Sequence, residues 1–304
     1  MARKPRLEFP GAIYHVISRG NYRKPIFEGG GGPAFEKALF QACEKCGWLL
    51  HAYVIMNNHY HLAVETPQPN LVEGMRWLQG TFGIRFNAYH RERGHVFQSR
   101  YKSLVIEEGR PLLGLVNYIH LNPVRAGLSN ISELREFSLS SFPKFFAKSP
   151  ASYLVRSRFL GSLEFPDSPS GMKRYAEHLE FSEEHDPALK DEISRRYCRG
   201  WAVASQGYRK ELKAAFVESA TSESLGGAEW ADVKEAGWEK LLSSLLRAEG
   251  KSSLDLTRDA KSAAWKVKIA RKLRAESTAT NGWIAQRLAM GHPTRVCNLI
   301  RKKV

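Results

Sequence analysis

The sequence predicts an α+β fold, a ferredoxin-like antiparallel sheet with helices followed by a mainly α-helical C-terminal region. Two observations predict it. Over the first 128 residues, strand-like and helix-like segments follow the order β-α-β-β-α-β-α, which is the split βαβ arrangement with one more helix. After residue 129, a Ser- and Pro-rich stretch precedes segments that show no strand alternation. We therefore expect three parts, at 1–130, 131–230 and 231–304.

Hydrophobic spacing and turn residues place each element. The segment 11–20 has the β-branched and aromatic content of a strand, and a Gly-rich turn at 29–32 leads into the first helix. Asn57 and Asn58 supply turn chemistry between two strands, and Pro111 suits the first turn of a helix. The expected strands are 11–20, 48–56, 59–65 and 95–107, and the expected helices are 34–47, 70–94 and 110–128.

Apolar residues at helical spacing mark the buried side of the first two helices. They are Phe35, Leu39, Ala42 and Cys46 in the first helix, and Leu71, Met75, Leu78, Phe82 and Phe86 in the second. Cys43 and Cys46 form a C-x-x-C without a second pair or a nearby histidine, so we interpret them as core thiols rather than zinc ligands.

The charge balance points to a polyanionic partner. Lys and Arg number 46 against 31 Asp and Glu, for a net charge of +15, which favours nucleic acid over a merely soluble basic protein. The apolar runs fall far short of the ~18 residues that a membrane span needs. No apolar stretch follows the basic N-terminus. We therefore expect a cytoplasmic, nucleoid-associated protein without a membrane partner.

The last quarter of the chain carries more than half of the excess charge, with 16 basic against 7 acidic residues from position 231 onward. Residues 282–304 predict a helix over 283–290, a turn at 291–293 and a second helix capped by Thr294. Apolar residues expected to pack the pair are Ile284, Ala285, Leu288, Val296 and Ile300. This helix-turn-helix could place Arg295, Asn298 and Arg301 in a DNA major groove. The alternative is an ordinary helical hairpin with a solvated basic face.

Two histidines lie one residue apart in the strand that begins at position 59. Because strand side chains alternate, His59 and His61 share a face, opposite Tyr60 and Leu62. Neutral imidazoles at this spacing can bind one cation, although two hydrogen-bonded structural histidines would give the same pattern.

A later helix adds two candidate residues. Tyr118 and Asn122 are four apart, on one helical face. An Asn carbonyl is a suitable third ligand for a hard cation such as Mg²⁺ or Mn²⁺. Pro123 disfavours helical geometry at the preceding residue, so this relation can loosen at its last step. A helix tyrosine half in the core is the alternative for Tyr118.

Four segments together resemble the single-tyrosine HUH transposases, and most closely the REP-associated tyrosine transposases. They are "AIYHVISRGNYRKPIF", "YVIMNNHYHLAVETP", "FQSRYKSLVIE" and "YIHLNPVRAGL". The resemblance covers about residues 8 to 128. The C-terminal half resembles longer members through "RGWAVASQGYRKEL" at 199–212 and the terminal helix-turn-helix. One departure is the "EGGGG" after "PIF", where relatives carry acidic residues; it affects a turn and not the site.

The resemblance implies an HUH nuclease domain that cleaves and rejoins single-stranded DNA beside a hairpin or palindromic element. His59 and His61 correspond to metal ligands, Tyr118 to the nucleophile and Asn122 to the polar ligand one turn later. Tyr118 would form a covalent 5′-phosphotyrosine and release a 3′-hydroxyl. The protein is expected to be a monomer or a homodimer. Basic and aromatic residues expected at single-stranded DNA are Arg19, Tyr22, Arg23, Arg85, Arg100, Tyr101 and Lys102.

Two other functions fit the same residues. A DNA-binding regulator that keeps the fold without cleaving would form no covalent adduct. A metal-dependent phosphodiesterase that uses water, with a structural Tyr118, would still cleave DNA after Tyr118→Phe. An RNA-binding ferredoxin-like domain is less well matched, because no central strand carries the RNP1 pattern.

Overall fold

The computed structural model describes residues 7–185, 196–198, 200–219, 231–277 and 279–301. It divides into two compact units, one over residues 7–205 and one from residue 206 onward. The sequence suggested divisions after 130 and 230. In the structure, the described residues of 131–205 belong to the same unit as the sheet, because they pack on it.

The first unit contains a five-stranded sheet in the order β2-β3-β1-β4-β5. Its strands are β1 (Ala12–Arg19), β2 (Leu49–Ile55), β3 (His59–Thr66), β4 (Lys102–Ile106) and β5 (Ala202–Val203). The first four strands pair antiparallel in the ferredoxin-like order, which confirms the predicted fold class. The register places Arg19 opposite His59 and Ile17 opposite His61.

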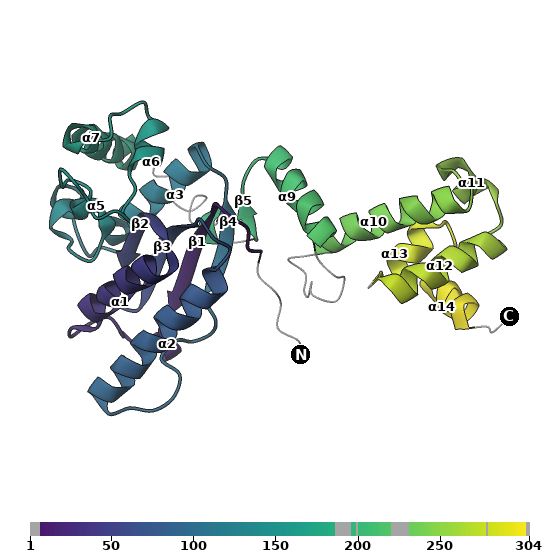
Figure 1. The fold of residues 1–304 in the computed structure, drawn as a ribbon, viewed down its shortest axis with the longest axis horizontal. Helices are drawn as coiled ribbons and strands as arrows, with labels where there is room; N and C mark the ends of the chain where they lie inside the picture. The colour runs from purple at the N-terminus through teal and green to yellow at the C-terminus, as the bar shows by residue number, and fades with distance from the viewer. Residues whose placement is uncertain (1–6, 186–195, 199, 220–230, 278, 302–304) are drawn as a thin grey trace. The chain divides into compact units, whose positions relative to one another are not determined.

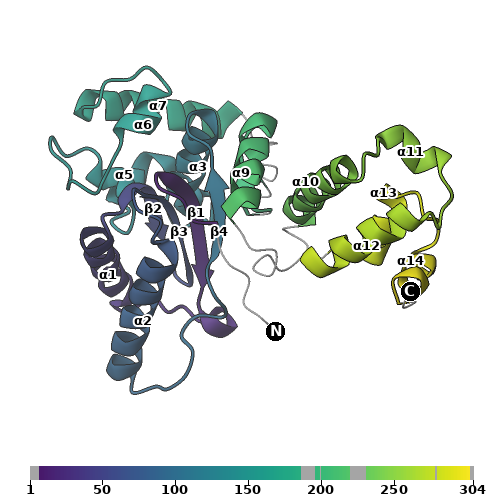
Figure 2. The same ribbon diagram turned by 45° about the vertical axis from the view of Figure 1, so that its right-hand side comes forward.

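Helices cover both faces of this sheet. The helices α1 (Gly31–Cys46) and α2 (Leu71–His90) lie side by side on one face (Figures 1 and 2). Phe27, Phe35 and Phe82 pack beneath them against Tyr60 of β3, whose ring stacks on Phe35 at 4.5 Å between centroids. The predicted buried stripes are confirmed, except that Cys46 and Phe86 are only half-buried.

The other face carries α3 (Arg110–His120), which packs on β2 and β3. α3 ends before Leu121, and a separate short helix, α4 (Asn122–Arg125), begins at Asn122. Asn122 is thus helical, and Pro123 lies in the first turn of the new helix, where its missing N–H is tolerated. The shorter elements η1 and η2 and the helices α5 to α7 complete the unit. Their bounds are Asn21–Arg23, Ile131–Glu136, Ser141–Lys144, Ser157–Gly161 and Pro169–His185.

Several elements differ from the expectation, including the helix expected over 70–94, which ends at His90. The strand expected over 95–107 begins only at Lys102, because Phe97 instead forms an isolated bridge with Gly20 beyond the end of β1. The first helix begins at Gly31, within the expected glycine turn, since only Gly29 and Gly30 have the positive φ of that turn. The C-terminal half is not wholly helical: β5 pairs parallel with β4, and two residues are too few to show alternation.

A buried polar cluster holds the back of α3. His120 Nδ1 lies 3.0 Å from the Tyr175 hydroxyl, and its Nε2 lies 2.9 Å from Ser141 Oγ. Tyr175 donates to Asn117 Oδ1 at 2.9 Å, so its oxygen accepts the His120 Nδ1–H. Phe142, Phe145 and Phe159 surround the imidazole, and burial lowers the pKa of His120 to about 3. α5, α6 and α7 thus fix one face of α3.

The second unit is helical. It comprises α9 (Gln206–Ser219), α10 (Ala231–Ala248), α11 (Ser253–Arg258), α12 (Ala264–Glu276), α13 (Asn281–Arg287) and α14 (Pro293–Arg301). Trp238 and Trp283 meet in its core with ring centroids 5.3 Å apart. Lys266 is fully buried, and its ammonium donates to the carbonyls of Leu256 and Asp259 at the end of α11.

The terminal helix pair confirms the predicted packing, with one correction. Ile284, Ala285, Leu288 and Val296 are buried and Ile300 is partly buried. Thr294 does not cap the second helix, because that helix begins one residue earlier. The imidazole of His292 instead accepts from the Thr294 backbone N–H at 3.3 Å. No helix in the described part of the chain is long and apolar enough to span a bilayer.

Replacing Tyr175 by Phe should destabilise the first unit. The change leaves the buried His120 Nδ1–H without its acceptor and Asn117 Oδ1 without its donor, so we expect a loss of about 1–3 kcal/mol in the free energy of unfolding. Urea denaturation of the full chain measures this loss. Tyr89→Phe, which removes a hydroxyl from an exposed side chain, should change the midpoint little. Equal stability of the two variants would contradict the role assigned to this cluster.

Candidate active site

The two histidines of β3 lie on the sheet face that carries α3, as alternation predicted. His61 is buried, and its ring centroid lies 5.4 Å from that of Tyr118 in an edge-on arrangement. His59 and His61 have centroids 5.1 Å apart. Tyr60, between them, faces α1 and α2 instead. The structure thus brings the histidine pair and the helix tyrosine together within one chain.

A third histidine, His15 of β1, orients His61. His15 Nδ1 lies 2.8 Å from the carbonyl oxygen of Tyr197, which can only accept, so this nitrogen carries the proton. Burial lowers the pKa of His15 to about 4, so the ring is neutral at pH 7 and its Nε2 is an acceptor. His61 Nδ1, at 2.9 Å from that Nε2, must therefore be the donor.

The tautomer of His61 follows. Burial, reinforced by His15, His59 and Arg19, lowers the pKa of His61 well below its usual value. A neutral His61 with its proton on Nδ1 carries the lone pair on Nε2. This is the arrangement that metal-binding histidines adopt, in which the other ring N–H is held by an outer partner.

His59 reaches the same tautomer by a different route. Its Nδ1 lies 2.8 Å from Asn58 Oδ1, while the Asn58 amide donates to the carbonyl of Arg23 at 3.2 Å. That second bond fixes the amide so that its oxygen faces the ring, and His59 Nδ1 must donate. Burial, with a smaller effect from Arg19, lowers the pKa of His59 to about 4. Both histidines of the pair are therefore neutral with unprotonated Nε2 atoms.

Tyr118 is almost covered, with 7% of its surface exposed. Its ring stacks on Tyr197 at 5.9 Å between centroids and meets the edge of His15 at the same distance. Its hydroxyl lies 3.5 Å from Cys198 Sγ. A short segment at 196–198, far along the chain, thus lines the tyrosine.

Three contacts anchor this segment to the sheet unit. Lys102 donates to the carbonyl of Cys198 at 2.6 Å, and the Tyr197 hydroxyl donates to the carbonyl of Pro111 at 2.7 Å. Gly114 of α3 allows the approach, because a Cβ there would collide with the Tyr197 hydroxyl. Sequence reasoning missed Tyr197 and Cys198, which have no local pattern that links them to Tyr118.

His15 was also missed as a site residue, although it lies in the first family-like motif. The sequence feature that could have identified it is an imidazole inside an otherwise apolar strand, the same feature that identified His59 and His61. Only the pairing of β1 with β3 shows that His15 and His61 share a face at hydrogen-bond distance.

Asn122 follows Tyr118 by one turn, on α4, and is half-buried. Its amide nitrogen reaches back to the Tyr118 carbonyl at 3.4 Å, so the i, i+4 relation survives the break at Leu121. The amide oxygen is the atom that this bond does not use. Among the described residues, no group of three or more His, Cys, Asp or Glu is arranged to hold a metal ion. A cation here would depend on the two imidazoles and a neutral oxygen donor.

The residues expected at DNA fall into four groups. Arg19, Tyr22, Arg23, Arg85 and Arg100 are exposed in the first unit, and Arg295 and Asn298 are exposed on α14. Lys102 is partly buried and engaged with Cys198. Tyr101 is a correction: only 6% of it is exposed, so its ring packs in the core and cannot stack on a base. The side chain of Arg301 lies outside the described residues.

Part of the first unit is similar to a known protein family. Residues 9–122 match the family model described as "Transposase IS200 like", which confirms the resemblance over that segment. A solved structure, "Structure of the REP associates tyrosine transposase bound to a REP hairpin", is also similar. It shares 17% identity with a TM-score of 0.41, over 48% of this chain and 85% of that chain. No curated protein matches the chain.

The tautomer of His61 should depend on His15. At pH 7, long-range ¹H–¹⁵N NMR should show protonated Nδ1 and unprotonated Nε2 in both His59 and His61. In His15→Phe, which removes the acceptor, we expect His61 to move toward the Nε2–H form while His59 keeps its tautomer through Asn58. An unchanged His61 would contradict the chain of hydrogen bonds from Tyr197.

Proposed function

We propose that the chain cleaves and rejoins single-stranded DNA through a covalent bond to Tyr118, with a divalent cation at the histidine pair. The observation that supports this most directly is the contact between Tyr118 and His61, beside two imidazoles whose Nε2 lone pairs are available. The family match over residues 9–122 supports DNA transposition as the class of reaction. It does not by itself establish the chemistry.

His59, His61 and Asn122 are the proposed ligands, and Mg²⁺ or Mn²⁺ is the proposed ion. The Asn122 amide oxygen and phosphate oxygens of bound DNA would suit such an ion, and the two neutral imidazoles would supply its nitrogen ligands. When bound, the cation would offset negative charge on the scissile phosphate during attack. Asn58 and His15 would keep the two imidazoles in their ligand tautomers.

In the proposed reaction, the Tyr118 oxygen attacks phosphorus and the bond from phosphorus to the 3′-oxygen breaks. The products are a 5′-phosphotyrosine and a 3′-hydroxyl, with the phenol proton passing to solvent and the 3′-oxygen acquiring one. Because one phosphodiester replaces another, rejoining needs no external energy source. Tyr197 and Cys198 would hold the phenol ring in place for this attack.

The proposed substrate is DNA that carries a hairpin or palindromic element next to a single-stranded segment. Arg19, Arg23 and Arg100 are exposed near the sheet end where β3 begins, and such residues neutralise a phosphate backbone. Since His61 and Tyr118 meet within one chain, a monomer could supply both. A homodimer stays compatible with the same geometry.

Tyr118→Phe should abolish adduct formation while DNA binding is retained. The variant keeps the ring that packs on Tyr197 and loses only the attacking oxygen. The test incubates the full chain with a labelled hairpin oligonucleotide and Mn²⁺, then looks for a labelled protein band on a denaturing gel.

The same test separates the alternatives. A non-cleaving regulator, for which the basic helical C-terminal unit would be suited, gives no adduct even with the native chain. A water-dependent phosphodiesterase gives cleavage products with Tyr118→Phe. Tyr153→Phe, which removes a hydroxyl from a half-buried ring that packs on Phe40, serves as the matched control and should form adduct like the native protein.

His59→Ala should remove the adduct and weaken Mn²⁺ binding while leaving hairpin binding largely intact. The reason is that it deletes one proposed ligand at a partly exposed position without opening the core. Isothermal titration with Mn²⁺ and fluorescence anisotropy with the hairpin measure the two effects separately. Parallel loss of metal and DNA binding would indicate a structural role for His59 instead.

A further inference from the structure

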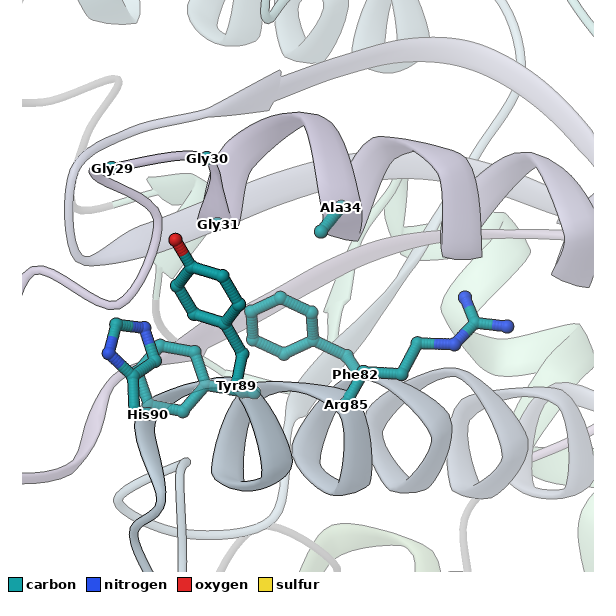
Figure 3. Close-up of a pocket in the computed structure, with 9 residues that line it drawn as sticks. Gly29, Gly30, Gly31, Ala34, Phe82, Arg85, Tyr89 and His90 are labelled. Atoms are coloured by element: carbon teal, nitrogen blue, oxygen red, sulfur yellow. The ribbon is translucent and has the colours of Figure 1, made fainter.

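A pocket of about 340 Å³ lies between the start of α1 and the end of α2, away from the Tyr118 face (Figure 3). Aromatic rings form one wall: Phe86 and His90 have centroids 4.3 Å apart, and Tyr89 meets His90 at 5.0 Å. The opposite wall is backbone and a methyl group, with Gly29, Gly30, Gly31 and Ala34 lining the pocket.

The pocket combines apolar surface with accessibility. The buried ring of Phe82 forms the floor of the pocket, whereas Tyr89 lies beside the opening and is 76% exposed. A Cβ at Gly29 or Gly30 would meet no other atom, so a ligand can approach the backbone of this turn closely.

Basic residues near the opening outnumber the exposed Glu28 that precedes Gly29. Arg85 lines the pocket, and its guanidinium donates one hydrogen bond to Gln41 Oε1 at 3.2 Å. Residues 91–95, which follow α2 directly, are exposed and contain Arg91 and Arg93 against a single acid, Glu92. Glu92 is itself paired with Lys24 at 3.6 Å. The surroundings therefore favour an anionic ligand.

The pocket also lies at the histidine end of the sheet. β1 ends at Arg19 opposite His59, and the chain then runs through residues 20–30 into the start of α1. Phe27 N donates to the Asn57 carbonyl, just before β3 begins. α2 runs back antiparallel to β3 and ends at the same side. A strand held at His59 can thus pass around this end toward the pocket.

We propose that this pocket binds one unpaired base of single-stranded DNA, stacked on the Tyr89 and Phe86 side, with Arg85 at the adjoining phosphate. The ligand class rests on the proposed function, while the pocket itself rests on its aromatic, basic and glycine lining. A flat aromatic base can stack on these rings, and such stacking does not depend on which base is present. The departure "EGGGG" from the family pattern forms the glycine wall of this pocket.

The experiment compares the affinity of the full chain for two probes by fluorescence anisotropy, without added metal. One is a strand of about 20 thymidylates, and the other is an abasic strand of equal length and charge. The native protein should prefer the strand with bases by about 10-fold or more. Tyr89→Ala should lose about 10-fold of this preference, with little change in binding of the abasic strand.

Two further variants sharpen the test. Ala34→Tyr fills the pocket without removing any side chain, and it should lose the base preference as Tyr89→Ala does. Ile84→Ala alters an exposed residue of α2 outside the pocket lining and should behave like the native protein. A base preference that Tyr89→Ala and Ala34→Tyr leave unchanged, or no native binding to thymidylate, overturns the proposal.

These outcomes are separable from the proposed chemistry. Binding is measured without cleavage, so a chain that forms no adduct can still show a Tyr89-dependent base preference, which upholds the pocket. Conversely, if the chain forms the adduct but Tyr89→Ala leaves the base preference unchanged, the chemistry is upheld and the proposed role of the pocket is contradicted.

Discussion

The hydrogen bond between His15 and His61 is the constraint on which the rest of the site depends. It joins two strands far apart in sequence, and it fixes His61 as a donor through Nδ1 because the carbonyl of Tyr197 has already fixed His15. The lone pair of His61 is therefore on Nε2, the ring nitrogen that does not bond to His15. Burial keeps all of these rings neutral, so no like-charge repulsion opposes their contact. Burial and these hydrogen bonds together leave His59 and His61 as adjacent neutral rings, each with an unprotonated Nε2.

Placing a tyrosine against these rings requires that α3 be held on two sides. On the site face, Tyr118 contacts His61 and Tyr197. On the back, His120 and Asn117 bond to Tyr175 of α7. Rotation of α3 by one residue would expose buried polar groups on the back and lose the ring contacts in front. Residues 131–185 therefore do more than connect two parts of the chain, because they set the rotation of the helix that carries the tyrosine.

The sequence predicted the features that depend on local periodicity. Alternation placed His59 and His61 on one face, and helical spacing placed Tyr118 and Asn122 on another element with a break at Pro123. It could not predict features that depend on long-range pairing. His15 meets His61 only through strand register, and Tyr197 bonds to His15 from 182 residues further along the chain. β5 likewise pairs with a strand that lies about 100 residues earlier. Tyr101 was misassigned because an aromatic residue beside Arg100 and Lys102 has the same local pattern whether its ring faces solvent or core.

The loop between β1 and α1 links the histidine pair to the aromatic pocket in one continuous stretch of chain. The Asn58 side-chain oxygen accepts a hydrogen bond from His59, and its backbone carbonyl accepts one from the Gly20 N–H. The Asn58 amide donates to the carbonyl of Arg23. Tyr22 and Arg23 adopt positive φ within this loop, and Tyr22 is 87% exposed. Strained, exposed residues persist where surrounding contacts over-determine the backbone, and they concentrate at functional sites. The turn at Asn58 therefore holds two features at once, the imidazole of His59 and the loop that presents Tyr22 and Arg23. A change at Asn58 would disturb both, because the same residue bonds to the ring and to the loop backbone.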